Sequence, residues 1–133
     1  MRVIEFRGKD EQGKWIYGNL VRYTEDDGEQ ITCIVSTTRC KISAEVVFVV
    51  VNPDTVGQYI GLKDKHGNKI YEGDIVKHVG GMRRNEQGEW VDNPEFMTVE
   101  YIDARFNVDF YSKCTFSIEV IGNIHDNPEL IKQ

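Results

Sequence analysis

The feature that most constrains the fold is a short polar turn, containing glycine, that recurs ahead of strand-forming residues. Residues 9–21 and 63–76 follow the same pattern with one inserted residue, and residues 86–90 repeat residues 11–15. Glycine readily adopts positive φ, and polar residues around it followed by aromatic or β-branched residues are typical of a β-hairpin. The recurrence has two possible explanations. The segment was duplicated in an ancestor, or the same turn chemistry arose independently in each segment. On either explanation, each copy predicts a hairpin.

The rest of the chain also favours strands, because no segment shows a sustained helical period. Gly18 inside an apolar strand indicates a bulge or a close approach of backbone. The segment Asp126–Leu130 has a cap residue and a proline, which predict one helical turn at the C-terminal end. The predicted strands are 2–7, 15–23, 29–36, 41–51, 58–60, 70–71, 75–79, 96–102, 105–111 and 115–121.

The run Val46–Val51 is the longest uninterrupted apolar stretch. It is far shorter than the ~18 residues that cross a bilayer, so it predicts a buried strand rather than a membrane segment. Such a strand is covered on both faces by its own chain, or it is an edge hidden by a second subunit. A chain this small covers such a run poorly, so we expect a homo-oligomer.

The length of 133 residues favours one domain or two small lobes. Asn52–Pro53 ends the apolar run, since proline lacks the N–H that a strand ladder needs, and it is the expected boundary between lobes 1–52 and 53–133. The charged N-terminus does not resemble a secretory signal. The cysteines Cys33, Cys40 and Cys114 are odd in number and lack paired spacing, which indicates buried thiols in a reducing cytoplasm.

The net charge of −6 lies mostly in residues 80–133. Binding to phosphates requires Lys and Arg that displace counterions, so this balance makes nucleic acid an unfavoured partner. A basic protein partner, from the host or the phage, suits it better. The only adjacent basic pair, Arg83–Arg84, falls in the polar stretch Gly80–Asn93, which predicts a loop or a long hairpin tip.

Several polar residues are candidates for catalytic groups. His66 lies near Asp64 and Asp74 in sequence, and a hydrolase would need these residues, or His125, to converge in one cleft. No motif places a nucleophile or a held water beside them, and His78 is equally isolated. Asp74 is expected to accept hydrogen bonds from local backbone. The sequence therefore predicts no catalytic residue, and the chain is expected not to be an enzyme.

No cofactor or metal site is predicted either. The cysteines and histidines lack the two-to-four-residue spacing of structural zinc ligands. Gly57, Gly61, Gly67 and Gly73 match neither phosphate-binding glycine motif, so they are interpreted as turn residues. The aromatic residues could form a stacking platform or a peptide groove, or pack in a core, and the sequence leaves this open. They are Trp15, Tyr17, Tyr59, Tyr71 and Trp90.

Three blocks of the chain resemble the YopX family of phage and prophage proteins. They are residues 52–76, residues 6–9 with 15–18, and residues 119–130. The resemblance implies an N-terminal β region followed by a C-terminal lobe similar to an SH3-type β-barrel. It also implies a phage or prophage setting and no activity, because fold alone does not supply a function.

The resulting expectation is a mainly β, cytoplasmic, non-enzymatic interaction or assembly module. Its N-terminal β region would mediate oligomerisation. A nucleic-acid-binding small barrel is the first alternative, and a small hydrolase is the second.

Overall fold

The computed structural model describes residues 3–39, 44–78, 82–102, 105–106 and 118–131. The chain divides into two compact units, Met1–Tyr59 and Ile60–Gln133. The described residues are mainly β, as predicted, with two single 3-10 turns, η1 at Pro53–Thr55 and η3 at Pro128–Leu130. The predicted C-terminal helical turn is therefore confirmed. Neither turn is long enough to cross a membrane.

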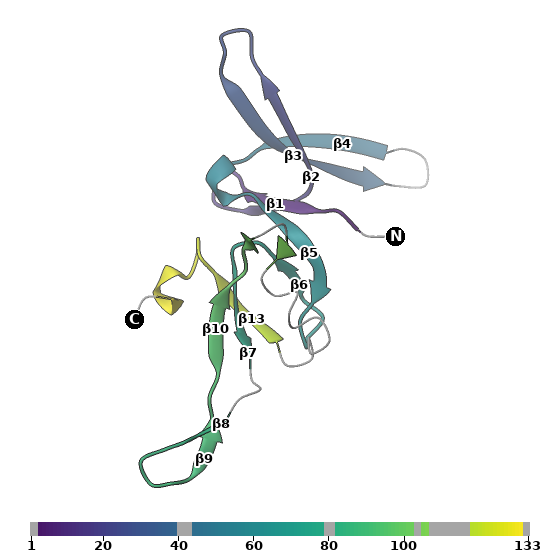
Figure 1. Cartoon of the computed structure of the whole chain (residues 1–133). Coiled ribbons are helices and arrows are strands. Elements are labelled where there is room, and N and C mark those ends of the chain that lie inside the picture. The colour runs from purple at the N-terminus through teal and green to yellow at the C-terminus, as the bar shows by residue number, and fades with distance from the viewer. Residues whose placement is uncertain (1–2, 40–43, 79–81, 103–104, 107–117, 132–133) are drawn as a thin grey trace. The chain divides into compact units, whose positions relative to one another are not determined.

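The first unit is an antiparallel sheet (Figure 1). Its strands lie in the order β4-β3-β2-β1-β5, and β5 continues into the second unit, where it pairs with β6. The strands are β1 (Phe6–Lys9), β2 (Trp15–Thr24), β3 (Gln30–Arg39), β4 (Ala44–Val50) and β5 (Gly57–Lys63).

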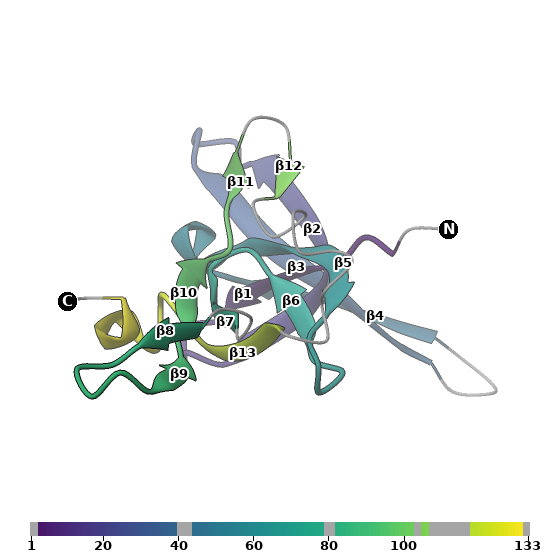
Figure 2. The ribbon, with the colours of Figure 1, turned by 60° about the horizontal axis from the view of Figure 1, so that its bottom comes forward.

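The second unit contains a three-stranded sheet of order β10-β7-β13 and two strand pairs, β8 with β9 and β11 with β12 (Figure 2). Its small core consists of Ile60, Ile70, Val76, Val99 and Ile118. The strands are β6 (Lys69–Tyr71), β7 (Asp74–His78), β8 (Met82–Arg84), β9 (Trp90–Asp92), β10 (Glu95–Thr98), β11 (Tyr101–Ile102), β12 (Arg105–Phe106) and β13 (Ile118–Asn123).

These sheets do not close into a barrel within the described residues. The expected SH3-type barrel is therefore not confirmed. The predicted strand 96–102 is interrupted near Val99. The N–H of Val99 donates to the carbonyl of Asp74 and so extends the β10–β7 register by one residue, but its carbonyl accepts the N–H of Gly73 instead of that of Asp74. Residues 107–117, which include much of two predicted strands and Cys114, lie outside the described residues, as does Cys40.

The recurring polar turn forms the same hairpin each time. In Asp10–Lys14, Asp64–Asn68 and Asn85–Glu89, the first N–H donates to the fifth carbonyl, and the glycine N–H donates to the first carbonyl. A fourth turn, at Glu25–Glu29, has the same two backbone hydrogen bonds. The glycines have φ between 79° and 89°, as this bulged hairpin requires. The three predicted hairpins are confirmed.

The side chain at the first position explains why the sequence pattern recurs. Oδ1 of Asp10 accepts the N–H groups of Gln12 and Lys14, each at 2.9 Å. Oδ1 of Asp64 does the same for His66 and Asn68, and Oδ1 of Asn85 for Gln87 and Glu89. A short Asp or Asn side chain at the first position reaches these donors, so local turn chemistry is sufficient to produce the shared pattern, with or without a duplication.

Gly18 confirms the predicted close approach of backbone. A Cβ atom at this position would lie 2.1 Å from the carbonyl oxygen of Val35. Because no side chain fits there, Gly18 allows β2 to change partners, from β1 before it to β3 after it.

Candidate interaction surface

Most side chains on one face of the β2–β3–β4 sheet are apolar, as the strand register shows, and the polar Asn19 lies on the same face, opposite Val35. Val21 lies opposite Cys33, which lies opposite Val50, and Val35 lies opposite Phe48. Directly opposed residues project from the same side of a sheet, and so do residues two apart on one strand. We call this the apolar face. Its members are Val21, Tyr23, Ile31, Cys33, Val35, Val46, Phe48 and Val50.

Much of the apolar face is open to solvent in the chain. Phe48 is 63% exposed, Val46 52% and Val50 49%. On the opposite side of the same strands Ile34 is fully buried and Val47 is 41% exposed, while Cys33 is a buried member of the apolar face. The interpretation of Val46–Val51 as a strand buried on both faces by its own chain is therefore wrong. The strand is an edge, since β4 ends the sheet among the described strands.

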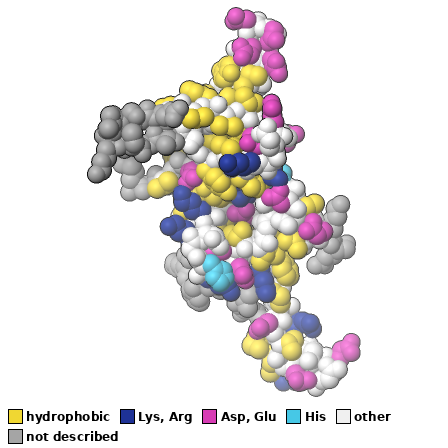
Figure 3. Space-filling view, turned by 180° about the vertical axis from the view of Figure 1, so that it is seen from behind, with side chains coloured by type: hydrophobic (Ala, Val, Ile, Leu, Met, Phe, Trp, Pro, Cys, Tyr) yellow, Lys and Arg dark blue, Asp and Glu magenta, His cyan; other side chains and the backbone are white. Residues whose placement is uncertain are grey.

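The tip of the β2–β3 hairpin adds negative charge beside the apolar face. Figure 3 shows the acidic side chains at this tip, with hydrophobic side chains on the sheet below it. Desolvation and the neighbouring Glu25 carboxylate raise the pKa of Tyr23 above its ordinary value. We call the four acidic residues at this tip the acidic rim. They are Glu25, Asp26, Asp27 and Glu29.

A second acidic group lies near the end of β4. The side chains of Asp10 and Glu11, from the β1–β2 turn, line an open hollow of about 330 Å³ together with Val50, Val51 and Asn52. Apolar and acidic groups therefore alternate along this part of the first unit. Such a surface is complementary to apolar residues flanked by Lys or Arg.

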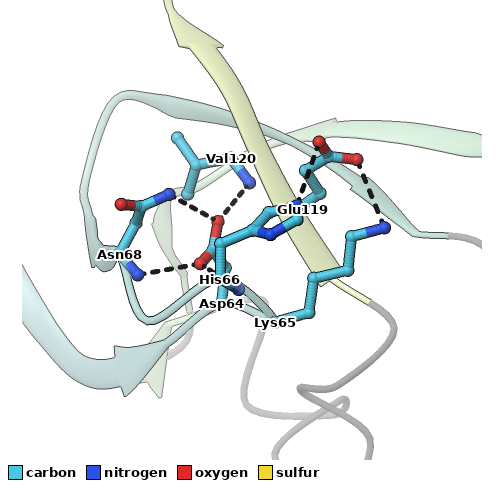
Figure 4. A network of polar contacts seen from close by, with 6 residues as sticks. All are labelled: Asp64, Lys65, His66, Asn68, Glu119 and Val120. Carbon is cyan, nitrogen blue, oxygen red and sulfur yellow. Dashed lines mark hydrogen bonds and ion pairs between the residues drawn. The ribbon is translucent and has the colours of Figure 1, made fainter.

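Asp64 and His66 belong to one polar network in the second unit (Figure 4). Both are candidate catalytic residues in the sequence. Besides its two turn bonds, Asp64 accepts the N–H of Val120 at 3.0 Å through Oδ2 and a bond from Asn68 Nδ2 at 3.3 Å. Desolvation raises the pKa of Asp64, but these hydrogen bonds outweigh it, so the pKa lies below its ordinary value.

The ring of His66 points toward β13. Its Nε2 lies 3.4 Å from Oε1 of Glu119, and Nζ of Lys65 lies 3.5 Å from Oε2 of the same carboxylate. These partly exposed side-chain contacts join the β5–β6 turn to β13. The network therefore holds the β5–β6 turn and β13 together.

Asp74 and His125 lie around the β6–β7 turn. Oδ2 of the buried Asp74 accepts the N–H of Tyr71 at 2.8 Å, which is the local backbone bond expected for it. The N–H of His125 donates to Asn123 Oδ1, and its ring packs near Gly73. His78 ends β7.

The remaining candidates also have structural positions. Cys33 is a buried free thiol, as predicted. No group of His, Cys, Asp and Glu in the described ranges could hold a metal ion. Gly67 and Gly73 have positive φ in turns, as predicted. The prediction is wrong for Gly57 and Gly61, because Gly57 begins β5 and Gly61 lies inside that strand, at positive φ.

The aromatic residues divide between core and surface. Tyr59 and Tyr71 are buried, Tyr17 and Trp90 are exposed, and Trp15 is half-buried. The guanidinium of Arg7 lies 4.4 Å from the ring centroid of Trp15, and that of Arg84 lies 5.0 Å from that of Trp90. Residues 80–93 include the predicted long hairpin, β8–β9.

The apolar face combines residues that the sequence marked with residues that it did not. The sequence marked the run Val46–Val51 as its longest apolar stretch, and Val46, Phe48 and Val50 of that run lie on this face. Tyr23 was missed as a surface residue. The signal was its position two residues after Val21 on the same strand, since both then share a face.

Comparison with known proteins agrees with this fold. The structure is similar to the crystal structure of protein EF1440 from Enterococcus faecalis, with a TM-score of 0.60 and 23% sequence identity over 99% of this chain and 100% of that chain. At this identity the likeness shows the fold alone. No curated protein matches the sequence. The family described as YopX protein matches residues 5–132, and the chain therefore belongs to the YopX family.

Proposed function

We propose that this chain is a non-enzymatic interaction or assembly module of phage or prophage origin, acting in the host cytoplasm. The observation that carries the proposal is the exposed apolar face. Hydration of an exposed apolar sheet face is unfavourable in free energy, and large faces of this kind mark interaction sites in soluble proteins.

A non-enzymatic role is supported by the polar residues that resembled a hydrolase site, because they take part in structural contacts. Asp64 and Asp74 accept backbone N–H groups, and the ring of His66 faces the carboxylate of Glu119. A catalytic base needs a reacting proton within hydrogen-bond reach rather than a backbone partner.

The charges around the face favour a protein partner over nucleic acid. The acidic rim would repel phosphates, whereas it would attract a partner whose apolar contact residues are flanked by Lys or Arg. Near the basic pair Arg83–Arg84, the same hairpin also carries Glu86, Glu89 and Asp92.

The proposal is tested by affinity capture from phage-infected host cells with three forms of the full chain. In the face variant, Tyr23→Ser with Val50→Ser removes two exposed apolar groups. In the control, Ile131→Ser removes an apolar side chain that is also 45% exposed but belongs to the second unit. The captured protein is then expressed and its affinity for each form measured.

We expect the face variant to weaken binding at least tenfold and the control to leave it unchanged. Raised salt should slow association, because the acidic rim attracts a basic partner. Equal affinity of all three forms would contradict the proposal, and so would binding of labelled DNA that is stronger at low salt and lost in the face variant.

A further inference from the structure

The outer edge of β4 is open for pairing with another strand, and the hydrogen bonds around it show which backbone groups are available. The N–H of Val51 donates to the carbonyl of Thr32 at 3.0 Å, which extends the β3–β4 register by one residue. Residues of an antiparallel strand alternate between bonding one neighbour and pointing away from it. Val47 and Val49 therefore bond β3, and Val46, Phe48 and Val50 point outward.

The next outward residue confirms this alternation. The N–H of Asn52 donates to the carbonyl of Lys9 at 2.9 Å, so the edge is occupied again just after β4. Within the described strands, Ala44–Val50 thus presents an open edge of seven residues.

Natural proteins protect open edges with Lys, Pro, bulges or very short strands. Val46–Val50 contains none of these, and every side chain in it is apolar. A strand that pairs with this edge must be apolar on both of its sides near its centre. β4 itself has that pattern.

We propose that β4 pairs antiparallel with β4 of a second copy of the chain, centred on Val47. This centre is the midpoint of Ala44–Val50 and gives the longest overlap. It places Val46 of each copy opposite Phe48 of the other. The outward N–H and C=O groups of these residues then face one another across the pair. The pairing joins the two apolar faces into one surface.

Charge favours this arrangement. The acidic hairpin tip, Glu25–Glu29, lies beyond the Val50 end of β4, since Cys33 opposite Val50 is close to the start of β3. Antiparallel pairing reverses the second copy and puts the two acidic tips at opposite ends of the joined sheet. Like charges are therefore kept apart.

The inference deepens the proposed function by naming one partner, and it rests on that function. Its first test is light scattering during size exclusion of the full chain at ~50 μM, a concentration at which moderate strand-paired dimers form. We expect twice the chain mass. Val46→Pro removes an outward N–H, which an edge strand tolerates, and should give a monomer with an unchanged circular dichroism spectrum. Val46→Ala keeps the N–H and should remain a dimer.

The second test maps the register by oxidation. In this pairing the two Val47 residues form a non-hydrogen-bonded pair with Cα atoms ~4.5 Å apart, which a disulfide can span. Val47→Cys should crosslink to itself, as peptide mass spectrometry would show, while Tyr23→Cys should not. This test decides the matter if Val46→Pro fails to fold.

A monomeric wild type, a Val46→Pro dimer, or crosslinking through Tyr23→Cys alone would overturn the inference. These outcomes are separate from the capture experiment. A monomer whose face variant still loses its partner would refute only the β4 pairing. A β4 dimer whose face variant binds normally would refute only the heterologous partner.

Discussion

Oδ2 of Asp64 accepts the backbone N–H of Val120 at 3.0 Å, although the two residues are 56 positions apart in the chain. The same carboxylate closes its own turn through Oδ1. One buried side chain thus fixes a hairpin turn and ties it to a distant strand. Asp10 holds an equivalent turn in the first unit, with both of its turn bonds exposed.

This difference predicts how the two carboxylates respond to substitution. In Asp64→Asn an amide NH₂ must replace one carboxylate oxygen, so an acceptor for Val120 or for the turn is lost. We expect a loss of about 1–3 kcal/mol in the free energy of unfolding. Asp10→Asn is the control and should cost less than about 1 kcal/mol, since Asn85 shows that asparagine closes this turn. Urea unfolding measures both, and equal losses would contradict the role of Val120.

The lowered pKa of Asp64 predicts a loss of stability in acid. Between the folded pKa and the ordinary value of 3.8, the unfolded chain binds more protons than the folded chain. Stability from this group is therefore complete above the ordinary value and declines as pH falls through the folded pKa. Urea unfolding from about pH 6 to about pH 2.5 should show a smaller acid-dependent loss in Asp64→Asn than in the wild type. Parallel curves would exclude Asp64 as a contributor.

Gly18→Ala should destabilise the first unit strongly. The added Cβ would lie 2.1 Å from the carbonyl oxygen of Val35, and backbone must move to relieve the overlap. We expect a cost of at least about 2 kcal/mol. Gly13→Ala meets nothing within 4 Å and carries only the cost of positive φ, about 1 kcal/mol. If thermal unfolding ranks the two variants in the reverse order, the close approach at Gly18 is wrong.

Ile70→Ala should open a cavity in the core of the second unit. Ile70 is fully buried and packs with Ile60 and Val76. A loss of about 2–5 kcal/mol is expected for such a truncation. Ile131→Ala, at a position 45% exposed, should change stability by less than about 1 kcal/mol. Chemical denaturation followed by circular dichroism distinguishes them.

The hairpins were predictable because their causes are local. Asp10, Asp64 and Asn85 each reach N–H groups two and four residues ahead, and a glycine in each turn supplies positive φ. All of that chemistry lies within five consecutive residues. Strand positions between such turns follow from the same information.

The exposure of β4 was not predictable in the same way. The composition of Val46–Val50 is the same whether the strand is buried by its chain or lies at an edge. Which applies depends on the order of strands in the sheet, and that order is set by pairings between distant segments. The bond from Val120 to Asp64 escaped prediction for the same reason, since nothing near Val120 identifies its acceptor.

The four bulged turns also set the order in which the chain acquires its structure. Each hairpin closes a loop of only a few residues, so it can form in microseconds, before distant segments meet. The pairing of β1 with β5 and of β7 with β13 closes far longer loops and must come later. Until those contacts form, the strands carry unpaired edges, and among the described strands β4 is still an edge after they have formed. Synthesis at high concentration should therefore favour aggregation through β4. The open edge of this strand can pair with another chain during folding as well as after it.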